Sequence, residues 1–411
     1  MSVTEAERKQ RHPAVVVAAI AVALMMPVAV FAPLGEAPLC ACAGVAFLIR
    51  LLSEMSPAVL ARRLRQDPLV LLFAALLFFA ALSCSWSPGG LQSLRPMLEV
   101  AGMTLAGIVS LAAAQSLNAS ERGLILTALI AGLVVGGGLM AFELGFDGPI
   151  SRVLRRNDLH HFYTPARFKR GMTVLAILIW PAAYYFRARR GVLAGAAVIA
   201  CASAVILIST SRTSILGLVV ALAIGALSFL RFRALFKTVL WLAVAGILLA
   251  PAAAGTLWGY LQAKGIFTTP LEKYELGRLG IWDYATELFL RSPIVGWGMD
   301  ASRYLPPDPL NPRYRHLELH PHNATLQIAL ELGIPGLIIV FWGLFIVMRR
   351  ALNFRGARKA SAVTMLVSIL LVCSLGYGVW QVWWQAAAWL AVTLLVIAWR
   401  DGDETAKTHV S

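Results

Sequence analysis

Residues 323–348 read NATLQIALELGIPGLIIVFWGLFIVM and form the longest of the apolar segments in the chain. The segment exceeds the roughly 20 apolar residues that one helix needs to cross a lipid bilayer. Its only charged side chain is Glu331, which follows Asn323 and Gln327 at intervals of four residues. Such a spacing puts the three polar side chains on one face of a helix, and polar groups at membrane depth face protein or water rather than lipid. The segment therefore predicts a transmembrane helix with one polar face.

Further apolar segments of similar length lie on both sides of this one. We place them at 14–34, 37–53, 68–84, 93–116, 123–142, 171–186, 191–210, 213–230, 238–258, 360–378 and 380–399. Of the 411 residues, 59% are hydrophobic and only 14% are charged, against about 25% charged in soluble domains. This composition excludes a soluble globule, and it is too apolar for a disordered chain. We expect an all-α integral membrane protein with about twelve transmembrane helices, forming a single polytopic domain over residues 1–411.

Basic residues indicate the orientation of these helices. All of the main clusters fall on one side of a twelve-span count: Arg8/Lys9/Arg11, Arg62/Arg63/Arg65, Arg187/Arg189/Arg190, Arg231/Arg233/Lys237 and Arg349/Arg350/Arg355/Arg358/Lys359. By the positive-inside rule this side is the cytoplasm, so we expect both termini there. The first apolar segment is longer than the core of a signal peptide and many more follow, so we expect it to be retained. Topology thus accounts for the net charge of +15, and we expect no nucleic-acid partner.

Two polar segments remain on the outer side. Segment 143–170 is basic, and segment 259–322 is the longest polar stretch in the chain. Basic side chains at a membrane surface often bind lipid headgroups. The alternative is that 143–170 attracts an anionic substrate, and the residues leave both interpretations open. Within the longer segment, residues from Arg278 to Leu290 have a helical pattern, and a cluster of prolines from Pro306 to Pro312 predicts irregular structure.

The end of the longer segment carries candidate chemistry. It reads His320-Pro321-His322-Asn323 and runs directly into the polar-faced helix. Proline suits a first helical turn, so we expect this helix to begin at about His320 and to place His322 at the outer mouth of a polar cleft. A neutral imidazole can remove a proton from a hydroxyl near neutral pH. A histidine that only satisfies a helix end is the simpler alternative.

Two arginines complete the set of candidates. Arg212 lies in the hydroxyl-rich turn 209–214 between two apolar segments, and Arg278 lies in the long outer segment. An arginine at membrane depth is usually paired or functional, although it can also extend to the interface. Guanidinium groups bind phosphate oxygens in a bidentate manner and stay charged. Together with His322 they suit transfer of a group from a phosphate leaving group to an alcohol.

A bound metal ion is the main competing interpretation of this region. His316, Glu318, His320 and His322 alternate, and a strand would put them on one face. The spacing matches no strong zinc pattern. We therefore expect neither a metal nor another cofactor.

Several motifs together resemble the O-antigen ligase superfamily of bacterial inner-membrane glycosyltransferases. They are the Ser-Arg turn at 211–212, Gly-Arg-x-x-x-Trp at 277–282, Pro-x-x-Gly-Trp-Gly at 293–298, and His-Pro-His-Asn-x-x-Leu-Gln at 320–327. The resemblance in motifs covers about 209–340 and implies a membrane-embedded fold of the GT-C kind, with 259–322 as the periplasmic loop. It also implies that His322 is catalytic and that Arg212 and Arg278 bind the pyrophosphate of an undecaprenyl-linked glycan. The superfamily is thought to be metal-independent and inverting.

The resemblance leads to a hypothesis about function. We expect an inner-membrane ligase that joins O-antigen polysaccharide to lipid A–core, with His322 as general base and with Asn323, Gln327, Glu331 and His320 in support. A polymerase that extends a growing glycan shares the same motifs and is the alternative within this class. A polytopic transporter or flippase is the alternative outside it, but we find no internal repeat of the kind common in transporters.

Overall fold

The computed structural model describes residues 11–154, 165–209, 211–229, 233–265, 277–309, 316–317 and 319–408. All regular structure within these ranges is helical. The α-helices are α2 (Pro13–Phe31), α3 (Glu36–Leu52), α4 (Pro57–Arg65), α5 (Pro68–Ser83), α6 (Leu94–Ala114), α7 (Ala119–Gly145), α8 (Pro149–Leu154), α9 (Lys169–Arg190), α10 (Val192–Leu207), α11 (Arg212–Leu227), α12 (Arg233–Ala263), α14 (Gly277–Arg291), α15 (Ala324–Asn353), α16 (Gly356–Leu375) and α17 (Val382–Thr408). Four short 3-10 helices are η1 (Pro33–Gly35), η2 (Gly90–Ser93), η3 (Pro165–Phe168) and η4 (Ala301–Arg303).

Each of the twelve apolar segments coincides with one of these helices. Among the described residues, nine helices are long and apolar enough to cross a membrane, and α4 with α5 forms a further candidate that is bent by 89°. Helices α10 and α11 are apolar but have only 16 residues each. The prediction of an all-helical polytopic membrane protein is therefore confirmed, whereas the count of twelve spans stays a prediction.

Local sequence signals explain where many of the helices begin. Asp67 and Asn118 accept hydrogen bonds from backbone N–H groups in the first turns of α5 and α7. Asn118 forms a reciprocal capping box with Glu121. Helices α2, α4 and α5 also have proline at their first position, where the missing N–H costs nothing. Short polar turns therefore separate the apolar helices cleanly.

Helix α9 lies at the centre of the bundle. Every residue from Gly171 to Ala183 is buried, as expected for a helix surrounded by protein. Helix α17 packs against α9, α6 and α3, and α16 packs against α9 and α11. Helices α5, α10 and α12 lie nearer the outside and expose large apolar side chains such as Phe78, Leu193 and Leu242.

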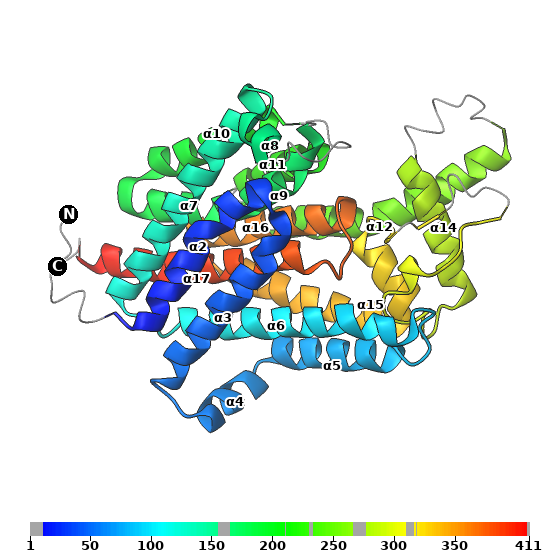
Figure 1. Cartoon of the computed structure of the whole chain (residues 1–411), viewed down its shortest axis with the longest axis horizontal. Helices are drawn as coiled ribbons and strands as arrows, with labels where there is room; N and C mark the ends of the chain where they lie inside the picture. The colour runs from blue at the N-terminus through cyan, green and yellow to red at the C-terminus, as the bar shows by residue number, and fades with distance from the viewer. Residues whose placement is uncertain are drawn as a thin grey trace.

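The long axis of the molecule has two distinct ends. Figure 1 shows the first turn of α2 and the last turns of α17 at one end, and α14 at the other. We call these the terminal end and the α14 end. At the terminal end, Arg11 donates to Ser120 at 2.7 Å and Arg400 donates to the carbonyl of Ala114 at 3.2 Å. Both ends of the described chain thus meet the connection between α6 and α7, which agrees with the prediction that they lie on one side of the membrane.

Both outer segments contain helices within the described ranges. Segment 143–170 contains the end of α7, then α8, η3 and the first turn of α9, and residues 155–164 lie outside the described ranges. In segment 259–322, α14 confirms the helix predicted from Arg278 to Leu290. Residues 305–308 are irregular, as the prolines indicate, whereas Pro312 lies outside the described ranges.

Candidate active site

Helix α15 begins at Ala324, four residues later than the sequence suggested. Its N-cap is Asn323, whose side-chain oxygen accepts from the N–H of Leu326 at 2.7 Å. The expected start at His320 is wrong because His322 takes a left-handed backbone conformation (φ 55°), which a right-handed helix cannot include. Pro321 therefore belongs to a tight turn before the helix.

The polar face of α15 is buried in protein, as predicted. Gln327 donates to Glu331 at 3.1 Å and accepts from the N–H of Val379 at 2.8 Å. Glu331 is fully buried and accepts from the N–H of Asp300 at 2.7 Å and from the indole of Trp380 at 2.5 Å. These bonds attach two loops to the outer half of α15. The polar face of α15 therefore positions the neighbouring loops, because protein N–H groups occupy the acceptor atoms of Gln327 and Glu331.

A break in α15 explains the Pro-x-x-Gly-Trp-Gly motif. Gly333 has a non-helical conformation, which frees the carbonyls of the preceding turn. The N–H groups of Trp297 and Gly298 donate to the carbonyls of Leu330 and Glu331 at 2.9 and 2.8 Å. A Cβ on Gly296 would lie 2.4 Å from the carbonyl oxygen of Glu331, so only glycine permits this approach.

The two histidines have different environments. Half-buried His322 has its Nδ1 3.0 Å from the carbonyl oxygen of Gly376. Since a carbonyl only accepts, Nδ1 carries the proton and the lone pair lies on Nε2. Buried His320 accepts the backbone N–H of His322 on its own Nδ1 at 3.1 Å. Burial lowers the pKa of His320 to about 3, assisted by positive charge on neighbouring groups that include His322 and Arg303.

Arg278 lies at the start of α14, and the Gly-Arg-x-x-x-Trp spacing has a structural reason. Arg278 and Trp282 are one turn apart on the same helix. The Nη1 of Arg278 donates to the carbonyl of Leu375 at 2.6 Å, and the indole of Trp282 donates to the carbonyl of Pro321 at 3.0 Å. The motif thus fixes α14 to both the end of α16 and the histidine turn.

Arg212 is the first residue of α11 and is exposed. The neighbouring Thr213 hydroxyl donates to the carbonyl of Leu375 at 3.5 Å, so Arg212 begins its helix beside the same carbonyl that Arg278 contacts. The predicted turn between α10 and α11 is confirmed, although Thr210 lies outside the described ranges. A chain of hydroxyls continues from Ser214 through Thr173 to Tyr377, with distances of 3.4 and 3.3 Å.

The end of α16 is therefore the place where the predicted site residues meet. Leu375 and Gly376 offer carbonyls to Arg278, to His322 and to the neighbour of Arg212. This segment, with the α16–α17 connection at 376–381, was missed by sequence reasoning, which treated it only as a boundary between two spans. The Gly376-Tyr377-Gly378 sequence is the signal that could have indicated it.

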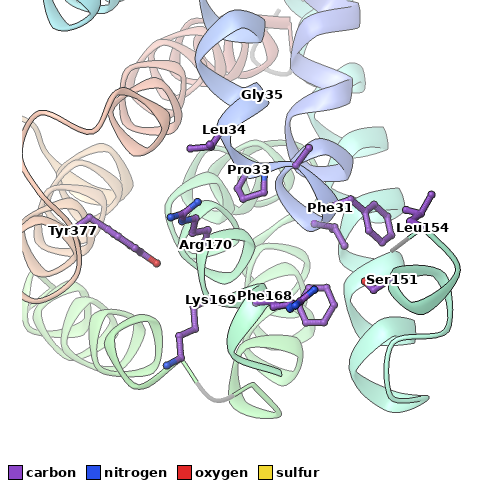
Figure 2. Close-up of a pocket in the computed structure, with 13 residues that line it drawn as sticks. Phe31, Pro33, Leu34, Gly35, Ser151, Leu154, Phe168, Lys169, Arg170 and Tyr377 are labelled. Carbon is purple, nitrogen blue, oxygen red and sulfur yellow. The ribbon is translucent and has the colours of Figure 1, made fainter. Parts of the chain in front are cut away.

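Two cavities lie beside this connection. We call the first the basic cavity; it measures about 680 Å³, and its lining includes Arg167, Lys169, Arg170 and Tyr377. Figure 2 shows Arg170 between the Pro33–Gly35 turn and the side chain of Tyr377. We call the second the histidine cavity; it measures about 590 Å³, and its lining includes His320, Gln327, Gln381, Asp300 and Arg303. The described lining of these two cavities includes His320 but not His322, Arg212 or Arg278.

Acidic groups near the histidine cavity are few and are neutralised. Asp300 pairs with Arg303 at 3.1 Å, and burial raises the pKa of its carboxyl. Within the described residues, no group of three or more His, Cys, Asp or Glu side chains is placed to hold a metal ion. Glu318, one member of the alternating His/Glu set, lies outside the described ranges.

Comparison with known proteins places the motif-bearing region in a family. Residues 196–341 match the family described as O-antigen ligase, and this range contains Arg212, Arg278 and His322. The chain is 26% identical over 355 residues to a Rickettsia conorii protein named "Putative polysaccharide ligase", covering 82% of this chain and 81% of that one. It is 25% identical over 371 residues to a Rickettsia felis protein of the same name, covering 86% and 85%.

Proposed function

This chain is a multi-pass membrane protein of the O-antigen ligase superfamily, and on that premise we propose that it transfers a glycan from undecaprenyl pyrophosphate to lipid A–core at the outer face of the bacterial inner membrane. The observation that carries the proposal is the meeting of Arg278, His322 and the start of α11 at the carbonyls of Leu375 and Gly376. The proposed chemistry needs a base and cationic groups close together, and the contacts of His322 and Arg278 with adjacent carbonyls support it.

In the proposed reaction, an acceptor sugar hydroxyl attacks the anomeric carbon of the donor. The bond from that carbon to the pyrophosphate oxygen breaks, and its electron pair leaves with undecaprenyl pyrophosphate. Attack from the face opposite to the leaving group inverts the anomeric configuration. The hydroxyl proton passes to Nε2 of His322, the nitrogen that the bond from Nδ1–H to Gly376 leaves as the base.

The arginines act on the leaving group in this proposal. Arg212 and Arg278 hold the pyrophosphate and stabilise negative charge as the glycosidic bond breaks. Both guanidinium groups lie at the ends of helices, one at the start of α11 and the other at the start of α14. Positive charge from arginine can replace a divalent cation in this role, which is why the proposal needs no metal.

One reconstituted reaction tests the proposal. Purified full-length protein is mixed with an undecaprenyl-pyrophosphate-linked glycan and either lipid A–core or a second copy of the donor, and the products are identified by mass. We expect glycan attached to lipid A–core, in the presence of a chelator, with the anomeric configuration inverted. Glycan of doubled length on the polyprenyl carrier would instead establish a polymerase. Transport of the intact donor across a vesicle membrane, with no new glycosidic bond, would refute transferase activity.

A further inference from the structure

Arg170 lies where the two cavities meet. It belongs to the first turn of α9 and is half-buried. Arg170 and Leu34 are the described residues that line both the basic cavity and the histidine cavity. A single guanidinium group can therefore contact a molecule that occupies either cavity or extends through both.

The hydrogen-bond donors of Arg170 are not used within the described part of the chain. Its guanidinium carbon lies 5.7 Å from the ring centroid of Trp383, a cation–π contact that holds the group without consuming its N–H donors. Trp383 is itself packed edge-on against Tyr377, with ring centroids 4.5 Å apart. Neither a hydrogen bond nor an ion pair joins Arg170 to another described residue. Five N–H donors in a rigid fork thus remain available to an oxyanion.

A buried acidic side chain lies within electrostatic reach of Arg170. Glu36, in the first turn of α3, is fully buried, and neither of its oxygens has a hydrogen-bond partner. It interacts electrostatically with Arg170 but does not form an ion pair with it. Glu36 therefore leaves the N–H donors of Arg170 unoccupied.

The lining of the basic cavity indicates what kind of molecule fits. Arg167 and Lys169 add positive charge beside Arg170, whereas the wall opposite is apolar and includes Phe31 and Leu154 (Figure 2). An amphiphile with an anionic head matches both parts. Phosphate suits the head, because a guanidinium group binds phosphate oxygens in a bidentate manner.

The α16–α17 connection adjoins both this cavity and the proposed donor site. Arg278 and His322 contact the carbonyls of Leu375 and Gly376. Tyr377, the next residue, lines the basic cavity, and its hydroxyl is influenced electrostatically by both Arg170 and Arg278. Both arginines therefore lie close to the α16–α17 connection, Arg278 at the carbonyl of Leu375 and Arg170 beside Tyr377.

From this arrangement we propose that Arg170 binds a phosphate group of the acceptor lipid, and that the basic and histidine cavities together hold this phosphorylated glycolipid beside His322. The proposal rests on the proposed function, in which Arg212 and Arg278 hold the donor. It assigns Arg170 to the acceptor, whereas Arg212 and Arg278 bind the donor pyrophosphate.

Binding measurements test the proposal without requiring turnover. Full-length protein in detergent is titrated with bisphosphoryl lipid A, with phosphatidylglycerol added as a competitor. Arg170→Ala should weaken lipid A binding by about tenfold or more, the effect of losing a charge-assisted hydrogen bond. The lipid A affinity of Arg170→Lys should lie between those of the wild type and Arg170→Ala, because lysine keeps the charge but lacks the forked geometry of the guanidinium group. Arg190→Ala, an exposed arginine at the other end of α9, should bind like the wild type.

The same titration contains the outcomes that would overturn the proposal. If both Arg170 variants bind bisphosphoryl lipid A as tightly as the wild type, Arg170 does not bind the acceptor. If equimolar phosphatidylglycerol displaces lipid A from the wild type, the cavity is a general headgroup site.

A transfer assay separates this proposal from the proposed function. Arg170→Ala should raise KM for the acceptor about tenfold and leave KM for the donor unchanged. A raised KM for the donor alone would move Arg170 to the donor site and refute the assignment. If the wild type transfers no glycan to any acceptor, the proposed function fails, while the binding titration still decides the role of Arg170.

Discussion

At the terminal end of the molecule, five arginines on neighbouring helices meet carboxylates, whereas three arginines near the α16–α17 connection do not. Buried Arg50 binds Glu121 through two nitrogens at 2.7 and 3.1 Å. Four further pairs lie at the same end: Arg122–Glu404, Arg189–Asp401, Arg350–Asp67 and Arg358–Asp403. These five arginines join helices to one another.

The three arginines near the α16–α17 connection have different surroundings. Arg278 donates to a backbone carbonyl, Arg170 stacks on Trp383, and Arg212 is exposed at the start of its helix. None of them forms an ion pair with a residue in the described ranges. Other arginines, such as Arg95 and Arg303 in the lining of the histidine cavity, pair with acidic residues close in sequence. We propose that the five paired arginines serve the fold, whereas Arg170, Arg212 and Arg278 are available to an anionic substrate.

The comparison requires the two ends to lie on opposite sides of the membrane, and labelling gives an all-or-none test. In a variant without native cysteines, Lys264→Cys, after α12, should react with an impermeant thiol reagent in intact cells whose outer membrane is permeable. Arg62→Cys, on α4, should react only after the inner membrane is permeabilised. Both positions are exposed. Labelling of position 264 from the cytoplasm alone would refute the topology and the proposed site with it.

Loss of His322 should have the largest effect on catalysis. His322→Ala should reduce turnover by at least about 100-fold, the lower end of a general-base contribution. Donor binding should persist, because Arg212 and Arg278 remain. Initial rates and donor affinity, measured on the same preparation, check both statements. His320→Ala should be milder, about tenfold, since it removes an acceptor for the backbone N–H of His322. If His322→Ala kept its activity and His320→Ala lost it, the roles of the two histidines would be reversed.

The pH dependence distinguishes the two histidines further. With a pKa of about 3, His320 stays neutral at every pH used for activity and cannot produce a titration near neutrality. A base must be unprotonated, so the wild-type rate should fall as the pH drops through about 6.5, the ordinary imidazole value. This acidic limb should persist in His320→Ala. A profile that stays flat from pH 5 to 8 would exclude a histidine base.

Substitution of the donor arginines by lysine should have an intermediate effect. Lysine keeps the charge but loses the two-pronged geometry that matches a phosphate. Arg212→Lys and Arg278→Lys should each lower kcat/KM by about tenfold to 100-fold, below the full loss of a transition-state donor. Arg291→Lys is a matched control at the other end of α14, since Arg291 already pairs with Glu287. Wild-type kinetics in either donor variant would remove that arginine from the mechanism.

The helices were predictable because apolar length is a strong signal. All twelve segments fall on helices, and the stripe of Asn323, Gln327 and Glu331 is buried as its spacing indicated. Helix α14 was recognisable from its pattern although it lies in a polar segment. These features depend on periodicity within one stretch of chain, which sequence displays directly.

The meeting point of the site residues was not predictable. It consists of backbone carbonyls at Leu375 and Gly376, and every residue has a carbonyl, so no side-chain pattern marks it. The start of α15 was misplaced because Pro321 suits both a first helical turn and the tight turn that it occupies, and only the left-handed His322 decides between them. The junction role of Arg170 depends on contacts among α3, α9 and α17, which are far apart in sequence.

The smallest effect should come from breaking an ion pair at the terminal end. Arg350 binds Asp67 through both nitrogens at 2.9 and 3.1 Å, but the two side chains are 46% and 39% exposed. Such pairs contribute roughly 0–1 kcal/mol, because water screens them and two long side chains must be held in place. Arg350→Ala should therefore shift the unfolding midpoint in detergent only slightly and leave the transfer rate unchanged. The same two measurements on Arg278→Ala should show a similarly small shift in stability but a large loss of transfer rate. If Arg350→Ala slowed transfer as strongly as Arg278→Ala, paired and unpaired arginines would not differ in function, and ion pairing would be no guide to the substrate-binding end of this protein.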